Sequence, residues 1–364
     1  MNDQATSYFV ANNMETDQYE KARATDSNDR FGTEYYEQVV FRIQNDTERT
    51  FLVLWTVTVL LTSLIGDSII LLVTFKYHTI KLHKVVIAVM QHMAICDLLQ
   101  TVFVVFPITL SLIFDRWMMG EVFCHIQDSF RWNGCMVTIL LTCVLTTLKM
   151  IIVKHPLKTG GWSSRFGHRI CGVVWLFYLG LETPQLYFII YGRGTIAFSY
   201  IAYMCEYSYF NSRLPDWYTY YALITFIGVP AISVLTIIAT SILLLVIAKG
   251  VAAQHGDSLR WKGISTVLLT VGVLLISQIG WWVMSSTIRG GGSQRILINL
   301  QFLNIMANFF IYSLTVPSFR LSLKLKISQI ISAMIPSDQQ RQRTLHGTDT
   351  RPACRPRQEA TVQV

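Results

Sequence analysis

The sequence predicts an all-α membrane protein: a seven-transmembrane helix bundle followed by a short cytoplasmic amphipathic helix. The chain is 52% hydrophobic and only 14% charged, whereas soluble domains carry about 25% charged residues. Lipid offers no partner to a main-chain amide, so each long apolar run is expected to be a helix. Seven runs are long enough to cross a bilayer, and they occupy residues 51–75, 84–112, 122–153, 168–190, 217–248, 260–288 and 294–316.

The cations of the connecting loops predict which side each loop occupies. Nineteen of the thirty Lys and Arg residues lie in 76–84, 149–169, 249–262 and the tail from 320. Cation-rich loops stay in the cytoplasm, so we expect a multi-pass plasma-membrane protein with an extracellular N-terminus. In a soluble protein the net charge of +8 would suggest nucleic acid. With this distribution we expect membrane lipids as partners and no nucleic acid.

Four regions follow from these patterns. Residues 1–50 carry ten acids and no apolar run, and are expected to form a disordered extracellular arm with a glycosylation acceptor at Asn45. Residues 51–317 form the bundle. Residues 318–336 place apolar side chains on one helical stripe, although their local alternation also fits a strand; we favour an interfacial helix. Residues 337–364 are expected to be a disordered cytoplasmic tail.

Short patterns within the spans carry a family resemblance. Trp117, Gly120 and Cys124 follow the spacing W-x-x-G-x-x-x-C at the start of the third run. Further patterns, in order, are Met93–Asp97, Leu148–Leu157, Trp175, Pro230 and Asn308–Tyr312 with Phe319. In their order and placement these patterns resemble rhodopsin-like (class A) G-protein-coupled receptors over about residues 51–330, with a divergent member as the expectation. The resemblance implies a disulfide between Cys124 and Cys205, both in an oxidising compartment.

Polar residues within the predicted spans form a candidate site in the middle of the bundle. The resemblance implies a sodium pocket, and the oxygen-bearing side chains that would form it are Asp97, Thr138, Asn304 and Asn308. Asp67 stands where the family usually has Asn. Two carboxylates facing each other across spans 1 and 2 either share a proton or hold a cation. The alternative is that Asp67 and Asp97 are polar contacts that hold helices together.

The outer half of the bundle is expected to hold the ligand. Phe302 occupies the position of the retinal-binding lysine and Arg131 that of the amine-binding aspartate, so an opsin and an amine receptor are disfavoured. An intramembrane arginine needs a partner, which could be Glu182, Asp128 or a ligand carboxylate. The candidate pocket residues are Gln127, Asp128, Arg131, Glu182, Gln278, Trp281, Trp282 and Phe302.

The cytoplasmic ends of the spans depart from the family pattern. Lys149 replaces the family's arginine, and Lys lacks the planar fork that suits bidentate contacts. The span-6 position that often supplies an acid to hold this cation is Arg260. We therefore expect raised basal signalling or altered coupling; the alternative is a tolerated substitution with near-normal coupling. The candidate coupling residues are Lys149, Pro156, Leu157, Arg260 and Tyr312.

Together these observations predict a receptor that transmits an extracellular ligand to a heterotrimeric G protein. The long, aromatic loop 191–217 favours a peptide ligand. Alternatives are a receptor for a small anionic ligand, a non-coupling decoy, and a transporter or channel. The sequence contains no catalytic constellation, so an enzyme is not expected. No cofactor is expected, and no metal apart from sodium.

Overall fold

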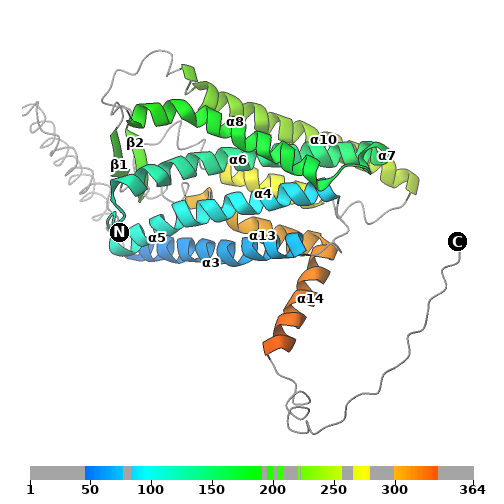
Figure 1. Cartoon of the computed structure of the whole chain (residues 1–364), viewed down its shortest axis with the longest axis horizontal. Helices are drawn as coiled ribbons and strands as arrows, with labels where there is room; N and C mark the ends of the chain where they lie inside the picture. The colour runs from blue at the N-terminus through cyan, green and yellow to red at the C-terminus, as the bar shows by residue number, and fades with distance from the viewer. Residues whose placement is uncertain are drawn as a thin grey trace, which may run out of the picture.

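The computed structural model describes residues 46–76, 83–190, 195–199, 203–208, 220–221, 223–255, 265–278 and 299–334. In this part of the chain the helices run side by side along the long axis of the molecule, with a β-hairpin at one end and α7 at the other (Figure 1). We call these the hairpin end and the α7 end. The predicted seven-helix bundle is confirmed. Residues 1–45 of the predicted arm, which include Asn45, and the tail from 337 lie outside the described residues. Residues 46–50, which the sequence assigned to the disordered arm, are instead the beginning of helix α3.

Helices α3 to α8 form the first four spans. They are α3 (Asp46–Lys76), α4 (Lys84–Gln100) continued by the π-helix η1 (Thr101–Val105) and α5 (Phe106–Phe114), α6 (Gly120–Lys154), the short α7 (Pro156–Thr159) and α8 (Ser164–Ile190). The π turn precedes Pro107, whose ring has no N–H to donate and crowds the preceding turn of an α-helix. A wider turn at this point lets span 2 continue past the proline.

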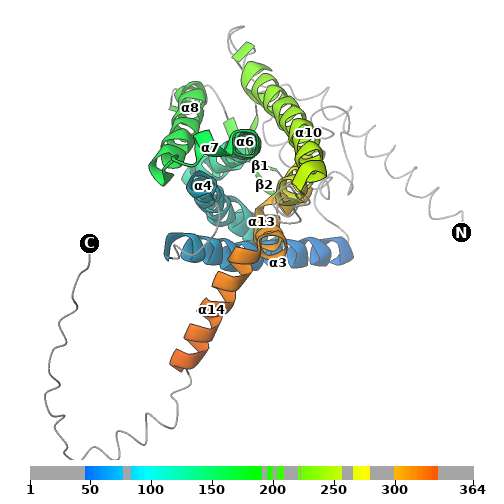
Figure 2. The same cartoon turned by 90° about the vertical axis from the view of Figure 1, so that its right-hand side faces the viewer.

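The remaining elements are the hairpin strands β1 (Thr195–Ser199) and β2 (Met204–Ser208), the π-helix η2 (Ile224–Gly228), α10 (Val229–His255), the helical segment Ser265–Gln278, α13 (Leu303–Thr315) and α14 (Pro317–Met334). The strands are antiparallel, with Phe198 opposite Cys205. Helix α14 leaves the bundle at a steep angle (Figure 2). Residues 317–334 are therefore helical, not a strand, while their position at a membrane surface stays a prediction.

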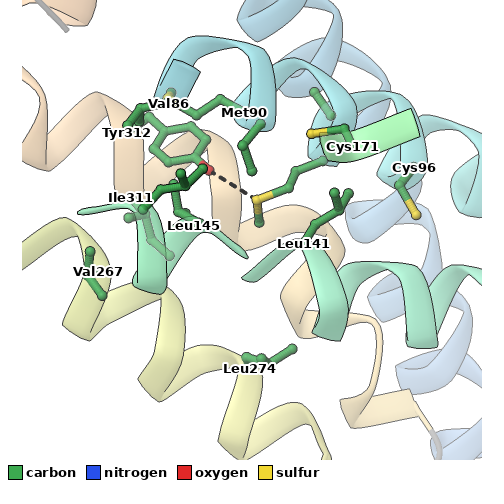
Figure 3. Packing of buried hydrophobic residues seen from close by; sticks show 14 of the residues in the cluster. Val86, Met90, Cys96, Leu141, Leu145, Cys171, Val267, Leu274, Ile311 and Tyr312 are labelled. Atoms are coloured by element: carbon green, nitrogen blue, oxygen red, sulfur yellow. Dashed lines mark hydrogen bonds between the residues drawn. The ribbon is translucent and has the colours of Figure 1, made fainter. Parts of the chain in front are cut away.

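Within the described ranges, four helices are long and apolar enough to cross a membrane: Asp46–Phe75, Lys84–Phe114, Gly120–Lys154 and Val229–Ile247. The segments Ser265–Gln278 and Leu303–Thr315 are shorter apolar helices. Burial of apolar side chains between the helices fixes their packing. Figure 3 shows part of this core, to which Met90 of α4, Leu145 of α6, Val267 of the segment Ser265–Gln278 and Ile311 of α13 all belong. The hydroxyl of Tyr312 reaches the Met93 sulfur at 3.9 Å in the same core.

Glycines mark the closest helix contacts. A Cβ built on Gly66 of α3 would lie 2.6 Å from the Cβ of Phe309 on α13, and one built on Gly167 of α8 would lie 2.8 Å from that of Ala88 on α4. Side chains at either position would push the helices apart. The absence of a side chain at Gly66 thus leaves room for Phe309.

Candidate functional site

A disulfide closes the hairpin end of the bundle. Cys124 on the first turns of α6 is bonded to Cys205 of β2, which confirms the predicted pair. Gln127, one turn further along α6, accepts a hydrogen bond from the main-chain N–H of Cys205 at 2.9 Å. Its amide group also reaches the carbonyl of Val104 at 3.5 Å. Gln127, predicted to line the ligand pocket, is thus fully buried and holds the hairpin against spans 2 and 3.

A second junction at the same end joins three distant segments. The Arg49 guanidinium of α3 donates to the carbonyls of Leu112 and Ile113, at 2.9 and 2.7 Å, and lies 3.9 Å from Asp115. These carbonyls belong to the last turn of α5, where main-chain acceptors lack helical partners. Tyr203, which precedes β2, donates to Asp115 at 2.8 Å. Sequence reasoning missed this junction because neither Arg49 nor Tyr203 belongs to a recognisable pattern.

The predicted intramembrane cation has a partner within its own helix. Arg131 donates to the Asp128 carboxylate at 2.9 Å, and both side chains are buried. The guanidinium also lies 5.1 Å from the ring centre of Trp132, within cation–π range. Of the three partners that the sequence left open, Asp128 is therefore the one that pairs with Arg131 in this structure. The side chain of Glu182 is not among those described.

Several other predicted pocket residues meet beneath this ion pair. Gln278 contacts the Cys135 sulfur at 3.2 Å, and Phe302 is buried in the apolar cluster of the hairpin end. They line a small cavity of about 20 Å³ together with Gln100, Arg131, Cys135, Thr138, Gln301, Asn304 and Ile305. This volume suits one water molecule. Trp281 and Trp282 lie outside the described residues.

The four residues of the predicted sodium pocket make different contacts and do not form one cluster of hydrogen bonds. Asn308 of α13 donates to Asp97 of α4 at 2.6 Å. Thr138 instead contacts Cys96 and Gln100, and Asn304 lines the cavity beside Arg131. Asp67 contacts Ser63, whose hydroxyl lies 2.6 Å from that of Thr101. The carboxylates are fully buried. Sequence reasoning missed Ser63 and Thr101, and sodium binding stays a prediction.

Three of the predicted coupling residues, Lys149, Pro156 and Leu157, lie towards the α7 end. Lys149 is half-buried near the end of α6, while Pro156 opens α7. Leu157 is 96% exposed. The ring of His83, before α4, contacts the carbonyl of Thr159 at 2.9 Å and thereby anchors α7 to span 2. Tyr312 lies in the core instead of at the surface, and Arg260 lies outside the described residues.

A bundle of long apolar helices with a disulfide-linked hairpin over its third span is the architecture of a multi-pass membrane protein. The family model described as "7 transmembrane receptor (rhodopsin family)" matches residues 66–289, more than half of the chain. The chain belongs to this family. The structure of squid rhodopsin superposes with a TM-score of 0.61 over 85% of this chain and 93% of that chain. At 14% sequence identity this likeness shows the fold alone.

Known relatives match over shorter stretches. Neuropeptide Y receptor type 5 of Sus scrofa is 28% identical over 94 residues, covering 26% of this chain and 21% of the relative. A purinoceptor of Homo sapiens is 25% identical over 101 residues, covering 28% and 27%. Chemerin-like receptor 1 of Homo sapiens is 25% identical over 142 residues, covering 38% and 37%. The chain thus matches well under half the length of each relative.

Proposed function

We propose that the chain is a plasma-membrane receptor, with its N-terminus outside, that transmits an extracellular ligand to a heterotrimeric G protein. Membership of the rhodopsin family supports the receptor class. The loop cations support the orientation, which places the hairpin end outside and the α7 end in the cytoplasm.

Leu157 is the observation that carries the coupling proposal. Single exposed apolar side chains are common on proteins, but this leucine is held in place. The Thr159 hydroxyl donates back to His155, and the Thr159 carbonyl contacts His83. Leu157 is thereby presented beyond the end of α6, 96% exposed, on an anchored turn. Such a side chain suits insertion into an apolar pocket of a cytoplasmic partner.

A peptide is the ligand class that the hairpin end supports best. A two-stranded hairpin offers main-chain groups to which an extended peptide can add. The relatives include proteins named neuropeptide Y receptor and chemerin-like receptor. A small anionic ligand is the second candidate, because the Arg131 guanidinium could bind a carboxylate or phosphate with two parallel hydrogen bonds. In that case the ligand would displace Asp128 from Arg131.

The test is nucleotide exchange on a G protein by the full chain in lipid nanodiscs, with ligands drawn from a peptide library. Leu157→Asp should abolish ligand-stimulated exchange while leaving ligand affinity within about twofold. Leu157→Met is the matched control and should retain exchange, because volume-conserving apolar changes are well tolerated. Ligand binding without exchange in the wild type would identify a decoy. Ligand-independent solute flux in liposomes would identify a transporter or channel.

A further inference from the structure

A second cavity, of about 440 Å³, lies between spans 2, 3 and 4. We call it the lateral cavity, and the helices that enclose it, α4, α6 and α8, lie side by side in Figures 1 and 2. Most of its wall is apolar or aromatic: Leu99 of α4, Phe130 of α6, and Trp175, Tyr178 and Leu179 of α8. This volume and this kind of lining are typical of small-molecule sites, which measure roughly 300–1,000 Å³.

The lateral cavity reaches the outer flank of the bundle. Leu179 in its wall is 59% exposed, and its neighbours Leu176 and Phe177 on α8 are exposed as well. On a helix that crosses a bilayer, exposed apolar side chains lie among the lipid tails. A molecule that passes Leu179 into the cavity therefore arrives from the bilayer, and it must itself be largely apolar.

Gln100 separates the lateral cavity from the interior of the bundle. Its side chain packs directly on α6, where a Cβ built on Gly134 would lie 2.2 Å from Gln100 Cγ. Its amide nitrogen lies 3.4 Å from the Thr138 hydroxyl. Among the described residues, Gln100 alone lines both the lateral cavity and the small cavity beside Arg131. The lateral cavity is thus distinct from the predicted ligand pocket.

Asn133 of α6 provides a hydrogen-bond acceptor in the lining of the lateral cavity. Its amide nitrogen donates to the main-chain carbonyl of Ser129 at 2.6 Å. Its Oδ1 atom is buried and accepts no hydrogen bond from the described residues. A buried carbonyl without a donor is unfavourable. The hydroxyl of Thr183, in the same lining, already donates to the carbonyl of Leu179.

We propose that the lateral cavity is a binding site for a compact, largely apolar, membrane-soluble molecule that carries one hydrogen-bond donor. The donor, a hydroxyl or an N–H group, pairs with Asn133 Oδ1, and the body of the molecule packs on Phe130 and Trp175. A charged ligand is disfavoured, because none of the described residues that line the cavity carries a charge and a buried charge needs a partner.

Photocrosslinking of the full chain in lipid nanodiscs tests this site with two matched probes. 4-(Hydroxymethyl)benzophenone is apolar and has one hydroxyl group, whereas 4-ethylbenzophenone has a methyl group in the place of that hydroxyl. The hydroxyl probe should label residues 129–134 and 175–183 saturably, as located by mass spectrometry of the peptides. At equal concentrations in the bilayer the ethyl probe should label them about tenfold less, because it leaves Asn133 Oδ1 without a donor.

Two variants show whether Asn133 is responsible for this preference. Asn133→Leu keeps the size of the side chain but removes the acceptor, so both probes should label it equally. Thr183→Val is the matched control and should keep the tenfold preference, since the Thr183 hydroxyl is already bonded within α8.

Three results would overturn the proposal. Equal and unsaturable labelling of the wild type by both probes would mean that lipid tails merely fill the cavity. Labelling concentrated at residues 278 and 301–305 would place the probe in the small cavity beside Arg131 instead. A tenfold preference that persists in Asn133→Leu would exclude Asn133 as the acceptor.

Discussion

Gln127 Oε1 and the main-chain nitrogen of Cys205 lie 2.9 Å apart. This hydrogen bond is a second link between the hairpin and span 3, in addition to the disulfide between Cys124 and Cys205. The N–H group of Cys205 is buried with its residue. Without Gln127 it would lose its acceptor, and an unsatisfied buried donor destabilises a protein more than a missing contact at the surface.

We therefore expect Gln127→Leu to lower the free energy of unfolding by about 1–3 kcal/mol, although leucine matches glutamine closely in size. Thermal unfolding of the detergent-purified chain, with the disulfide kept oxidised, measures this effect. Thr58→Val is a suitable control, because the Thr58 hydroxyl only bonds back to its own helix at an exposed position. Equal unfolding midpoints for wild type and Gln127→Leu would show that this hydrogen bond makes no net contribution to stability.

The contact between Gly66 and Phe309 gives a second prediction. An alanine Cβ at position 66 would lie 2.6 Å from the Phe309 Cβ, which is tied to the α13 backbone and cannot rotate away. Overpacking of this kind costs about 1–3 kcal/mol. Gly66→Ala should therefore lower the unfolding temperature, as measured by differential scanning fluorimetry.

Gly172 of α8 is the matched control for that substitution. A Cβ at Gly172 meets nothing within 4 Å, and alanine is the better helix former. Gly172→Ala should be neutral or slightly stabilising. If both alanine variants unfolded at the same temperature, close packing of α3 on α13 would not be the reason for glycine at position 66.

The Arg131–Asp128 pair allows a double-mutant cycle. Removing one partner of a buried ion pair leaves an uncompensated charge, and this costs about 3–5 kcal/mol. Each single variant, Arg131→Leu and Asp128→Leu, should strongly lower the free energy of unfolding. The double variant should lower it by clearly less than the sum of the two single effects. Urea unfolding of the solubilised chain measures this free energy for the wild type, the two single variants and the double variant. Additive losses would contradict the pairing.

Lys149 and Arg260 provide the prediction on signalling. By resemblance to the family, an acid at position 260 would restrain the cation of span 3, whereas two cations cannot form that restraint. Arg260→Glu should therefore lower agonist-free nucleotide exchange by roughly two- to fivefold, the shift that an exposed ion pair of about 0.5–1 kcal/mol produces.

Arg260→Gln is the control for that experiment, because it removes the positive charge without supplying an acid. It should lower basal exchange less than Arg260→Glu does. A silent wild type whose exchange is restored by Lys149→Arg would instead identify an impaired coupler.

Features that depend on the length of apolar runs could be predicted from the sequence, whereas the orientation inferred from loop charge stays a prediction. Seven runs of sufficient length indicate seven helices whatever their neighbours are. The partners Cys124 and Cys205 could be named because the resemblance supplies their positions. For residues 318–336 the sequence favours a helix over a strand, although the FRLSLKLKI alternation also fits a strand, and the structure has helix α14 over Pro317–Met334.

Features that depend on the register between helices could not be predicted. The contact of Ser63 with Thr101 requires α3 and η1 to pack at one particular height, and a serine in an apolar run gives no indication of this. The strands Thr195–Ser199 and Met204–Ser208 were missed for a related reason: a hairpin in a loop depends on its anchorage by Cys205, not on local propensity alone. For Arg131, Asp128 was one of three partners that the sequence left open, and the structure shows that Arg131 pairs with it.

The junction of Arg49, Asp115 and Tyr203 imposes an order on biosynthesis. Tyr203 follows Asp115 by 88 residues, which a ribosome adds in roughly 4–18 s at about 5–20 residues per second. Until then the contact that joins Arg49 and Asp115 to Tyr203 cannot form. The hairpin end of the bundle therefore gains its last contacts only after α8, which precedes Tyr203, has been translated.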